Sequence, residues 1–163
     1  MTQLSGTIQQ YQGRTIDYLA FDDAQPSGDT LLSQVLVKPG QSGAIITGIE
    51  KLVQRFLIEL LTESASLDYQ LARGTTFITA IRAGAVSTSA LLFSTFAAAE
   101  VDIRDNLRGE DNRAIDPDDE RYHSASLLSA TLFGDTATLT ISVRSVAGDS
   151  RVVIYPLRVS AAT

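Results

Sequence analysis

The sequence predicts an α+β fold, in which two or three helices pack on a three-stranded antiparallel sheet at the C-terminal end of the chain. Two observations lead to this prediction. Apolar residues recur at helical spacing between residues 46 and 107, and they alternate with polar residues between residues 127 and 159. Because all helical segments precede the strand segments, we expect the helices and the sheet to form separate layers.

Length and composition limit the classes of protein that fit. The chain has 163 residues, of which 44% are hydrophobic, and this suffices for one domain with a packed core. The formal net charge of −6 argues against a nonspecific nucleic-acid binder, which needs a basic face. The absence of cysteine excludes disulfides and thiolate metal sites. No secretion signal or membrane-spanning run is visible, so we expect a soluble protein made in a cytosol.

Residues 1–44 are predicted to form an extended arm with short strands, and residues 45–163 a single α+β domain. Within the arm, residues 14–23 alternate loosely between apolar and polar types, and residues 31–37 form a short apolar run. Clusters of turn-forming residues follow both segments, which is why we expect the arm to be rich in turns.

The first long helix is predicted from the segment that begins at residue 45. Its apolar residues are spaced by three and one, which places them on one wide stripe: Ile46, Ile49, Leu52, Val53, Phe56, Leu57, Leu60 and Leu61. We expect Leu52, Phe56 and Leu60 to be the main packing residues. The polar residues of the segment occupy the other side, which we expect to be solvated: Glu50, Lys51, Gln54, Arg55, Glu59 and Glu63.

Two more helices are expected before the sheet. A short one spans residues 75–84, with Thr75 or Thr76 as its N-cap and Gly84 at its end. A longer one follows after the cap residues 87–89 and is expected to end at Gly109. Its apolar stripe consists of Leu92, Phe96, Ala99, Ile103 and Leu107.

An acidic loop over residues 110–123 separates the helices from three predicted strands at residues 127–133, 136–146 and 150–159. The turns between the strands are short and polar, as hairpins require. In the middle strand, Ala137, Leu139, Ile141 and Val143 share one face. We expect an antiparallel meander whose last strand lies at an edge, and sheet edges favour pairing with another chain.

His123 is the only histidine, and it could act as a general base for Ser124 or Ser126. However, the chain has no Gly-x-Ser-x-Gly motif, so a surface or packing role is favoured. A second candidate is the acidic group Asp116, Asp118, Asp119 and Glu120, which could bind a divalent cation. Its spacing does not match a calcium loop, and we favour a solvated loop or salt-bridge partners.

Charged pairs at helical spacing are the remaining candidates. Glu59 and Glu63 lie four residues apart and could serve as acid and base, although a solvated helix face is favoured. Arg104 and Arg108, with Glu100 one turn earlier, are typical of ordinary helix contacts. We therefore expect no enzyme, no cofactor and no metal, but a binding or structural module.

Residues 48–77, GIEKLVQRFLIELLTESASLDYQLARGTTF, resemble the sheath-initiator family of contractile phage tails, also called lysozyme-like baseplate wedge proteins. In that family a helix ends in a Leu-Leu-Thr corner, and a polar turn leads to a Gly and a new helix. Leu60-Leu61-Thr62 and Gly74-Thr75 match these elements. The stretch would be a structural corner, with Leu67 and Tyr69 tucked under it and Thr75 or Thr76 capping the next helix.

The resemblance extends to the segment before the strands and covers about residues 45–159. The family has a Glu-Pro-Arg motif there, and this chain has Asp119, Glu120 and Arg121. Only Arg121 keeps its identity, and the Pro is absent. The ending RVVIYPLRV is similar to the closing strand of the family.

The resemblance implies a structural baseplate protein of the virion, assembled in the host cytoplasm and present in several copies in a ring around the tail. Strands of the tail sheath subunit would add to its C-terminal sheet and so form the first sheath ring. Baseplate wedge proteins and tail tube or hub proteins would be further partners, with no membrane or nucleic acid involved. The sheath-docking residues would be Leu139, Ile141, Val143, Val152, Ile154 and Tyr155.

Two further details follow from the same resemblance. Arg121 would pair with an acidic partner at the root of the sheet, and the first helix would pack on a wedge protein. Proline at Val152 or Ile154 is expected to abolish sheath assembly without unfolding the helices.

Two alternatives remain open. The first is another small tail or neck protein, such as a tail terminator or head–tail connector, which its position in the tail would reveal. The second is a cell-wall hydrolase, suggested only by the family's name. Glu63 and Asp68 are the only acidic residues within residues 61–77, and both fit a turn better than a pair of catalytic carboxylates. A peptidoglycan clearing assay with Glu63→Gln would test this alternative, and we expect no clearing.

Overall fold

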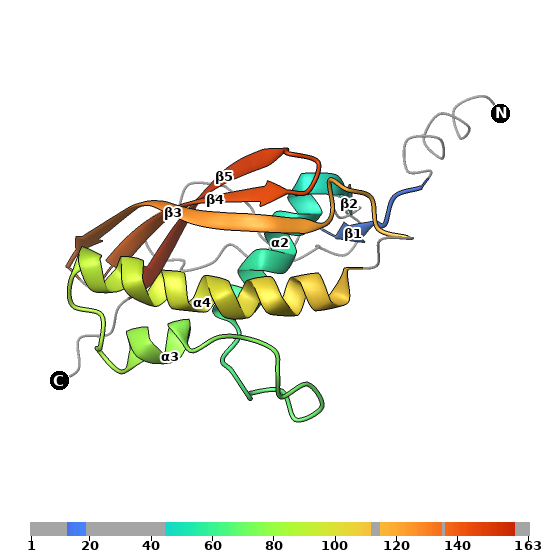
Figure 1. Cartoon of the computed structure of the whole chain (residues 1–163). Helices are drawn as coiled ribbons and strands as arrows, with labels where there is room; N and C mark the ends of the chain where they lie inside the picture. Colours follow the sequence, from blue (N-terminus) through green and yellow to red (C-terminus); the bar gives the residue numbers. More distant parts are fainter. Residues whose placement is uncertain (1–12, 19–44, 112–114, 135, 159–163) are drawn as a thin grey trace, which may run out of the picture.

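A computed structural model of the chain describes residues 13–18, 45–111, 115–134 and 136–158 (Figure 1). The short strand expected at residues 31–37 lies outside these residues. Within them, the helices are α2 (Gly48–Leu61), α3 (Phe77–Arg82) and α4 (Ser89–Glu110), and the strands are β1 (Asp17–Tyr18), β2 (Ile45–Ile46), β3 (Tyr122–Phe133), β4 (Thr136–Ser145) and β5 (Ser150–Arg158). No helix in the described part of the chain is long and apolar enough to cross a membrane.

The predicted α+β architecture is confirmed. Strands β3, β4 and β5 form an antiparallel sheet in that order, and β1 pairs with β2 in a separate two-stranded sheet. Helices α2 and α4 lie along one face of the larger sheet, with α3 beyond α4, and none of the described helices lies on the opposite face (Figure 1).

Helix α2 buries most of its predicted stripe, since Leu52, Phe56 and Leu60 are fully buried. The expected start at residue 45 is wrong, because Ile46 lies in β2 and the helix begins at Gly48. Its other side is not the uniformly solvated face that we expected. Gln54 is 4% exposed and Glu59 is 1% exposed, because the N-terminal strand and the corner after α2 cover them. The periodicity of a helix identifies its apolar side but does not say how many of the remaining sides other segments cover.

Both later helices begin as the cap residues predict. Thr76 is the N-cap residue of α3, where its side chain makes no capping hydrogen bond, although the Thr75 hydroxyl accepts one from the Phe77 amide. At the start of α4 the Thr88 hydroxyl accepts a capping bond from the Leu91 amide. All five predicted stripe residues of α4 are buried. The helix continues through Gly109 to Glu110 and ends at Asp111, whose amide donates to the Leu107 carbonyl. The expected stop at Gly109 is therefore wrong by one residue.

Strand β3 begins at Tyr122, five residues earlier than predicted. The pairing of β3 with β4 shifts register between Tyr122 and Ser124 and again between Leu127 and Ser129. Each shift inserts an extra residue and interrupts the alternation of inward and outward side chains. The two-residue period that marks a strand in a sequence is therefore lost over the first half of β3, although its backbone is extended.

The core joins every major element around a group of aromatic rings. The ring centroid of Phe56 lies 6.2 Å from that of Phe96 and 6.0 Å from that of Tyr122, and Phe77 lies 6.3 Å from Phe96. The Tyr122 hydroxyl donates to Glu100 Oε1 at 3.0 Å. Burial, together with the negative charge of Glu100, raises the pKa of Tyr122 far above that of a free tyrosine.

Candidate interaction site

The outer edge of β5 is the part of the predicted docking site that lies at the surface. In the order β3-β4-β5, strand β4 has neighbours on both sides, whereas β5 pairs only with β4 among the described strands. Val152 and Ile154 on β5 are 50% and 62% exposed. The edge position expected for the last strand is therefore confirmed.

Four of the six predicted docking residues belong to the core instead. Leu139, Ile141 and Val143 have no exposed surface, and Tyr155 is 6% exposed. Their side chains point from the sheet toward the helices, so they hold β4 and β5 in place and cannot contact a partner directly. The sequence could not separate these two roles, because alternation shows that two faces differ but not which face a helix layer covers.

The turn between β4 and β5 determines which backbone groups of β5 point outward. The Ser145 amide donates to the Asp149 carbonyl at 2.9 Å, and the Gly148 amide donates to the Ser145 carbonyl at 3.1 Å. Gly148 has φ +93°, a conformation that favours glycine, and it completes this turn. Bonded and non-bonded residue pairs alternate along an antiparallel ladder. Ser145 and Asp149 form a bonded pair, so every second residue of β5 counted from Asp149 bonds to β4. Val152 and Ile154 lie between those residues, and their N–H groups therefore point away from β4.

The position of Pro156 is consistent with this hydrogen-bonding pattern. It pairs with Thr138 two residues beyond Ile154, so its nitrogen also faces the outer edge. Proline has no N–H to donate, and in sheets it is restricted to positions where that N–H would face outward. The edge of β5 therefore offers three outward N–H donors, at Ser150, Val152 and Ile154, and then a position without a donor at Pro156.

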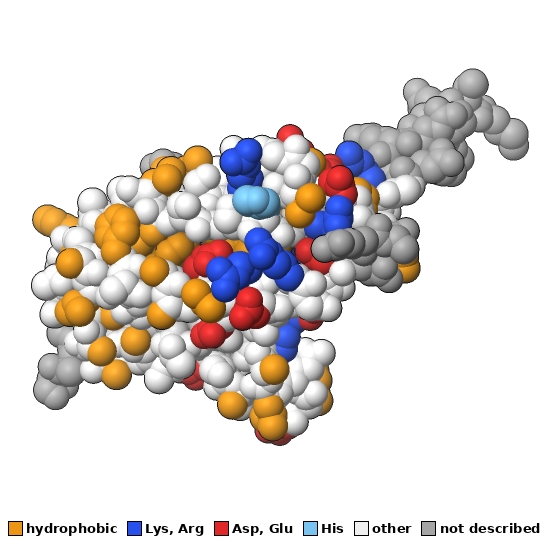
Figure 2. Space-filling model, viewed as in Figure 1, with side chains coloured by type: hydrophobic (Ala, Val, Ile, Leu, Met, Phe, Trp, Pro, Cys, Tyr) orange, Lys and Arg blue, Asp and Glu red, His pale blue; other side chains and the backbone are white. Residues whose placement is uncertain are grey.

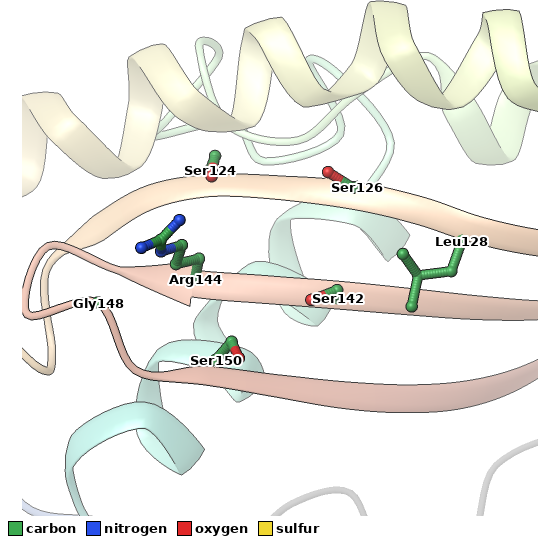
Figure 3. Close-up of a pocket in the computed structure, with 7 residues that line it drawn as sticks. All are labelled: Ser124, Ser126, Leu128, Ser142, Arg144, Gly148 and Ser150. Carbon is green, nitrogen blue, oxygen red and sulfur yellow. The ribbon is translucent and has the colours of Figure 1, made fainter.

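The face of the sheet that carries no helix is lined mainly by small polar side chains. A depression of about 430 Å³ lies on it, near the turn between β4 and β5. Figure 3 shows the residues that line it: Ser124, Ser126, Leu128, Ser142, Arg144, Gly148 and Ser150. Because most of these side chains are short, the surface is shallow and leaves the Arg144 guanidinium accessible.

The three residues of the motif-like segment hold the chain together locally. Glu120 is 1% exposed, and its carboxylate accepts from the Gly48 amide at 3.2 Å and lies 3.4 Å from Lys51 Nζ. It also accepts from the Thr15 hydroxyl. Asp119 pairs with Arg14. The sequence suggested a solvated loop or salt-bridge partners here, and the second interpretation is confirmed for Asp119 and Glu120.

Arg121 finds its acidic partner within its own loop, at Asp118, and not at a separate site. The same loop holds the turn between β4 and β5, because the Val146 amide donates to the Arg121 carbonyl and the Ala147 amide to the Asp118 carbonyl. The motif-like segment therefore fixes the end of the sheet at which β5 begins.

The corner after α2 is held by a buried carboxylate. Glu59 accepts from the Gly74 amide at 3.0 Å and from Asn106 Nδ2 at 3.3 Å, and it lies 2.6 Å from Arg73 Nε. The expectation that Tyr69 tucks under the corner is wrong, since this residue is 81% exposed. The polar network at the base of the corner replaces the apolar contact that we expected there.

The remaining residues that the sequence suggested for catalysis or metal binding do not come together in one site. His123 is exposed, and its Nδ1 lies 3.0 Å from Ser124 Oγ. No carboxylate in the described part of the chain holds the other ring nitrogen. Within the same described residues, no three His, Cys, Asp or Glu side chains gather as a metal site would require. Arg104 lies 4.0 Å from Glu100, which is the expected contact along α4.

Comparisons of the chain with protein-family models, with curated proteins and with solved structures found no match.

Proposed function

We propose that this chain is a structural subunit of a contractile tail baseplate, and that a strand of the sheath subunit adds to the outer edge of β5. The observation that carries the proposal is the outer edge of β5, which pairs only with β4 among the described strands and has the outward N–H groups of Val152 and Ile154. The resemblance of residues 45–159 to sheath initiators supplies the identity of the partner.

The physical properties of this edge suit strand addition. Backbone hydrogen bonds to β5 provide affinity that does not depend on sequence, and the exposed Val152 and Ile154 side chains help to fix the register of the incoming strand. Pro156 limits the donors to a short stretch, so the edge does not pair along its whole length with arbitrary strands. Several copies in a ring multiply contacts that are weak individually.

Wedge proteins remain proposed partners, but α2 is a poor surface for them. Leu52, Phe56 and Leu60 of this helix are fully buried within the chain itself. A contact with a wedge protein must therefore use another surface.

Ile154→Pro is the variant that tests the β5 edge. It removes one outward N–H and leaves the hydrogen bonds between β4 and β5 in place, because those use the neighbouring residues. Co-expression with the sheath subunit of the same tail, followed by affinity purification, should recover a complex with the unchanged protein and none with Ile154→Pro.

Two control variants make this result specific. Ile154→Thr keeps the N–H but removes most of the apolar side chain, and it should retain the complex. Val153→Pro is expected to unfold the protein, because Val153 is 5% exposed and its N–H faces β4. Unchanged recovery of the complex with a folded Ile154→Pro protein would rule out docking at β5.

A further inference from the structure

Two arginines differ from most of the cations that the structure describes. Eight Lys or Arg side chains form ion pairs with Asp or Glu: Arg14, Lys51, Arg55, Arg73, Arg82, Arg104, Arg121 and Arg151. Arg108 and Arg144 are exposed and have no carboxylate partner among the residues that the structure describes. In a chain of net charge −6, acidic side chains outnumber basic ones, so two cations left without such a partner require an explanation.

The two arginines lie on either side of His123. Arg108, at the end of α4, donates through Nη2 to the His123 carbonyl at 2.6 Å. His123 Nδ1 lies 3.0 Å from Ser124 Oγ, and Ser124 is the direct neighbour of Arg144 across the sheet. Arg108, His123 and Arg144 therefore form one row, which we call the basic row. Figure 2 shows Lys and Arg side chains gathered beside the histidine on this face of the molecule.

The surface next to the basic row suits a polypeptide with acidic side chains. The depression beside Arg144 is lined by the hydroxyls of Ser124, Ser126, Ser142 and Ser150 and by Gly148 (Figure 3). Hydroxyls donate to carboxylates, and arginine forms strong charge-assisted hydrogen bonds with them. Because the lining side chains are short, an extended chain can approach the sheet closely enough to reach both kinds of donor.

We propose that the basic row and the serine-lined depression beside it bind an acidic segment of a partner protein. Charge complementarity identifies this partner, since both guanidinium groups attract carboxylates and neither pairs with one among the described residues. A nucleic acid is a poor fit, because it needs a broad basic face along its phosphate backbone and the basic row supplies only two arginines. The depression lies on the face of the sheet, and Arg108 lies where the end of α4 meets β3, so the proposal does not depend on strand addition at the edge of β5.

The test uses a peptide of eight glutamates with blocked ends as the probe. Titration into the isotope-labelled full chain should shift the amide resonances of Ser124, Ser126, Ser142 and Arg144 and leave those of α3 unchanged. Arg144→Gln and Arg108→Gln should each weaken the peptide affinity about fivefold, and added salt should weaken it further.

Arg82→Gln is the matched control, because it removes one positive charge from α3 and should leave the affinity unchanged. A peptide of eight lysines should cause no shifts at the basic row. Absence of binding by the glutamate peptide would overturn the proposal, and so would equal weakening by Arg82→Gln. Equally tight binding of inorganic phosphate at the same residues would replace the acidic segment with a small-anion site and would also overturn it.

Discussion

At the scale of single residues, two buried glutamates determine how distant segments meet. Glu59 lies on α2 and holds the corner through the Gly74 amide and Arg73. Glu120 precedes β3 and joins the start of α2 to Thr15. A buried carboxylate is costly unless donors surround it, so each of these residues favours one arrangement of the chain over its alternatives.

The role of Glu59 is testable with Glu59→Gln. The neutral amide loses the attraction to Arg73 and presents an N–H₂ group where the site needs acceptors. Because Arg73 is one-quarter exposed, we expect a loss of about 2–3 kcal/mol in the free energy of unfolding, which is less than for a fully buried pair. Urea denaturation followed by circular dichroism measures this difference.

Glu63→Gln is the matched control for this change. It alters the same residue type one turn later, where Glu63 pairs with Arg82, whose side chain is 68% exposed. Exposed pairs contribute little, so the loss should stay below about 1 kcal/mol. Equal losses for the two variants would show that the buried network at Glu59 does not stabilise the corner.

The second residue-scale prediction concerns alkaline pH. Burial raises the pKa of the Tyr155 phenol to about 12, above its usual value of 10.0. The folded state therefore keeps this proton more tightly than the unfolded state does. Its contribution to stability is complete below pH 10 and is lost as the pH rises from 10 to 12.

Tyr155→Phe removes the ionisable group and keeps the ring. Between pH 10 and pH 12 the variant should lose less unfolding free energy than the unchanged protein, by on the order of 2 kcal/mol. Urea denaturation at several pH values checks this expectation. Parallel stability curves for both proteins over this pH range would contradict it.

At the scale of elements, the periodicity of apolar residues predicted the helices and strands that bury one side only. The stripes of α2 and α4 and the alternation of β4 are confirmed because each buries one regular face. The start of β3 was missed because two register shifts break its alternation. The burial of Glu59 and the exposure of Tyr69 were missed because both depend on contacts between residues that are distant in sequence.

The corner between α2 and α3 depends on Gly74. This residue has φ +82°, and a Cβ atom there would lie 2.5 Å from the Thr62 carbonyl oxygen. Gly74→Ala combines backbone strain with a clash against the main chain, and it should lower the free energy of unfolding by about 3 kcal/mol. Thermal or urea denaturation measures the change.

Gly109→Ala provides the opposite case in the same chain. Gly109 lies within α4, and no atom would lie within 4 Å of an added Cβ. Alanine favours helix, so this change should stabilise the protein by about 0.5 kcal/mol. If Gly74→Ala were as harmless as Gly109→Ala, the corner would not need its glycine.

At the scale of the whole molecule, the sequence predicted the order of the layers and the edge position of the last strand. It did not predict which residues of β5 face outward, because this depends on the hydrogen-bonding pattern of the turn at Gly148. It also did not reveal the basic row. Arg108 was assigned to ordinary contacts along its helix and Arg144 was not singled out, and the two stand out only once the partners of the other described cations are known.

The predicted boundary at residue 45 can be tested by shortening the chain. Residues 14–18 contact the domain: Gln54 Nε2 donates to Asp17 Oδ2 and to the Tyr18 carbonyl, each at 2.9 Å, and Thr15 donates to Glu120. A chain that begins at Ile45 leaves these buried polar groups with fewer partners. Each such loss costs about 1–3 kcal/mol, so we expect this chain to be about 2–4 kcal/mol less stable than the full chain.

A chain that begins at Gly13 keeps Arg14, Thr15 and Asp17, and it serves as the control. Its free energy of unfolding should match that of the full chain within about 0.5 kcal/mol, because it keeps the contacts of residues 14–18 with Gln54 and Glu120. Equal stability of the chains beginning at Gly13 and at Ile45 would show that the domain is complete from residue 45. The expected difference would instead place residues 14–18 within the folded unit, because Glu120 and Gln54 are buried beneath them.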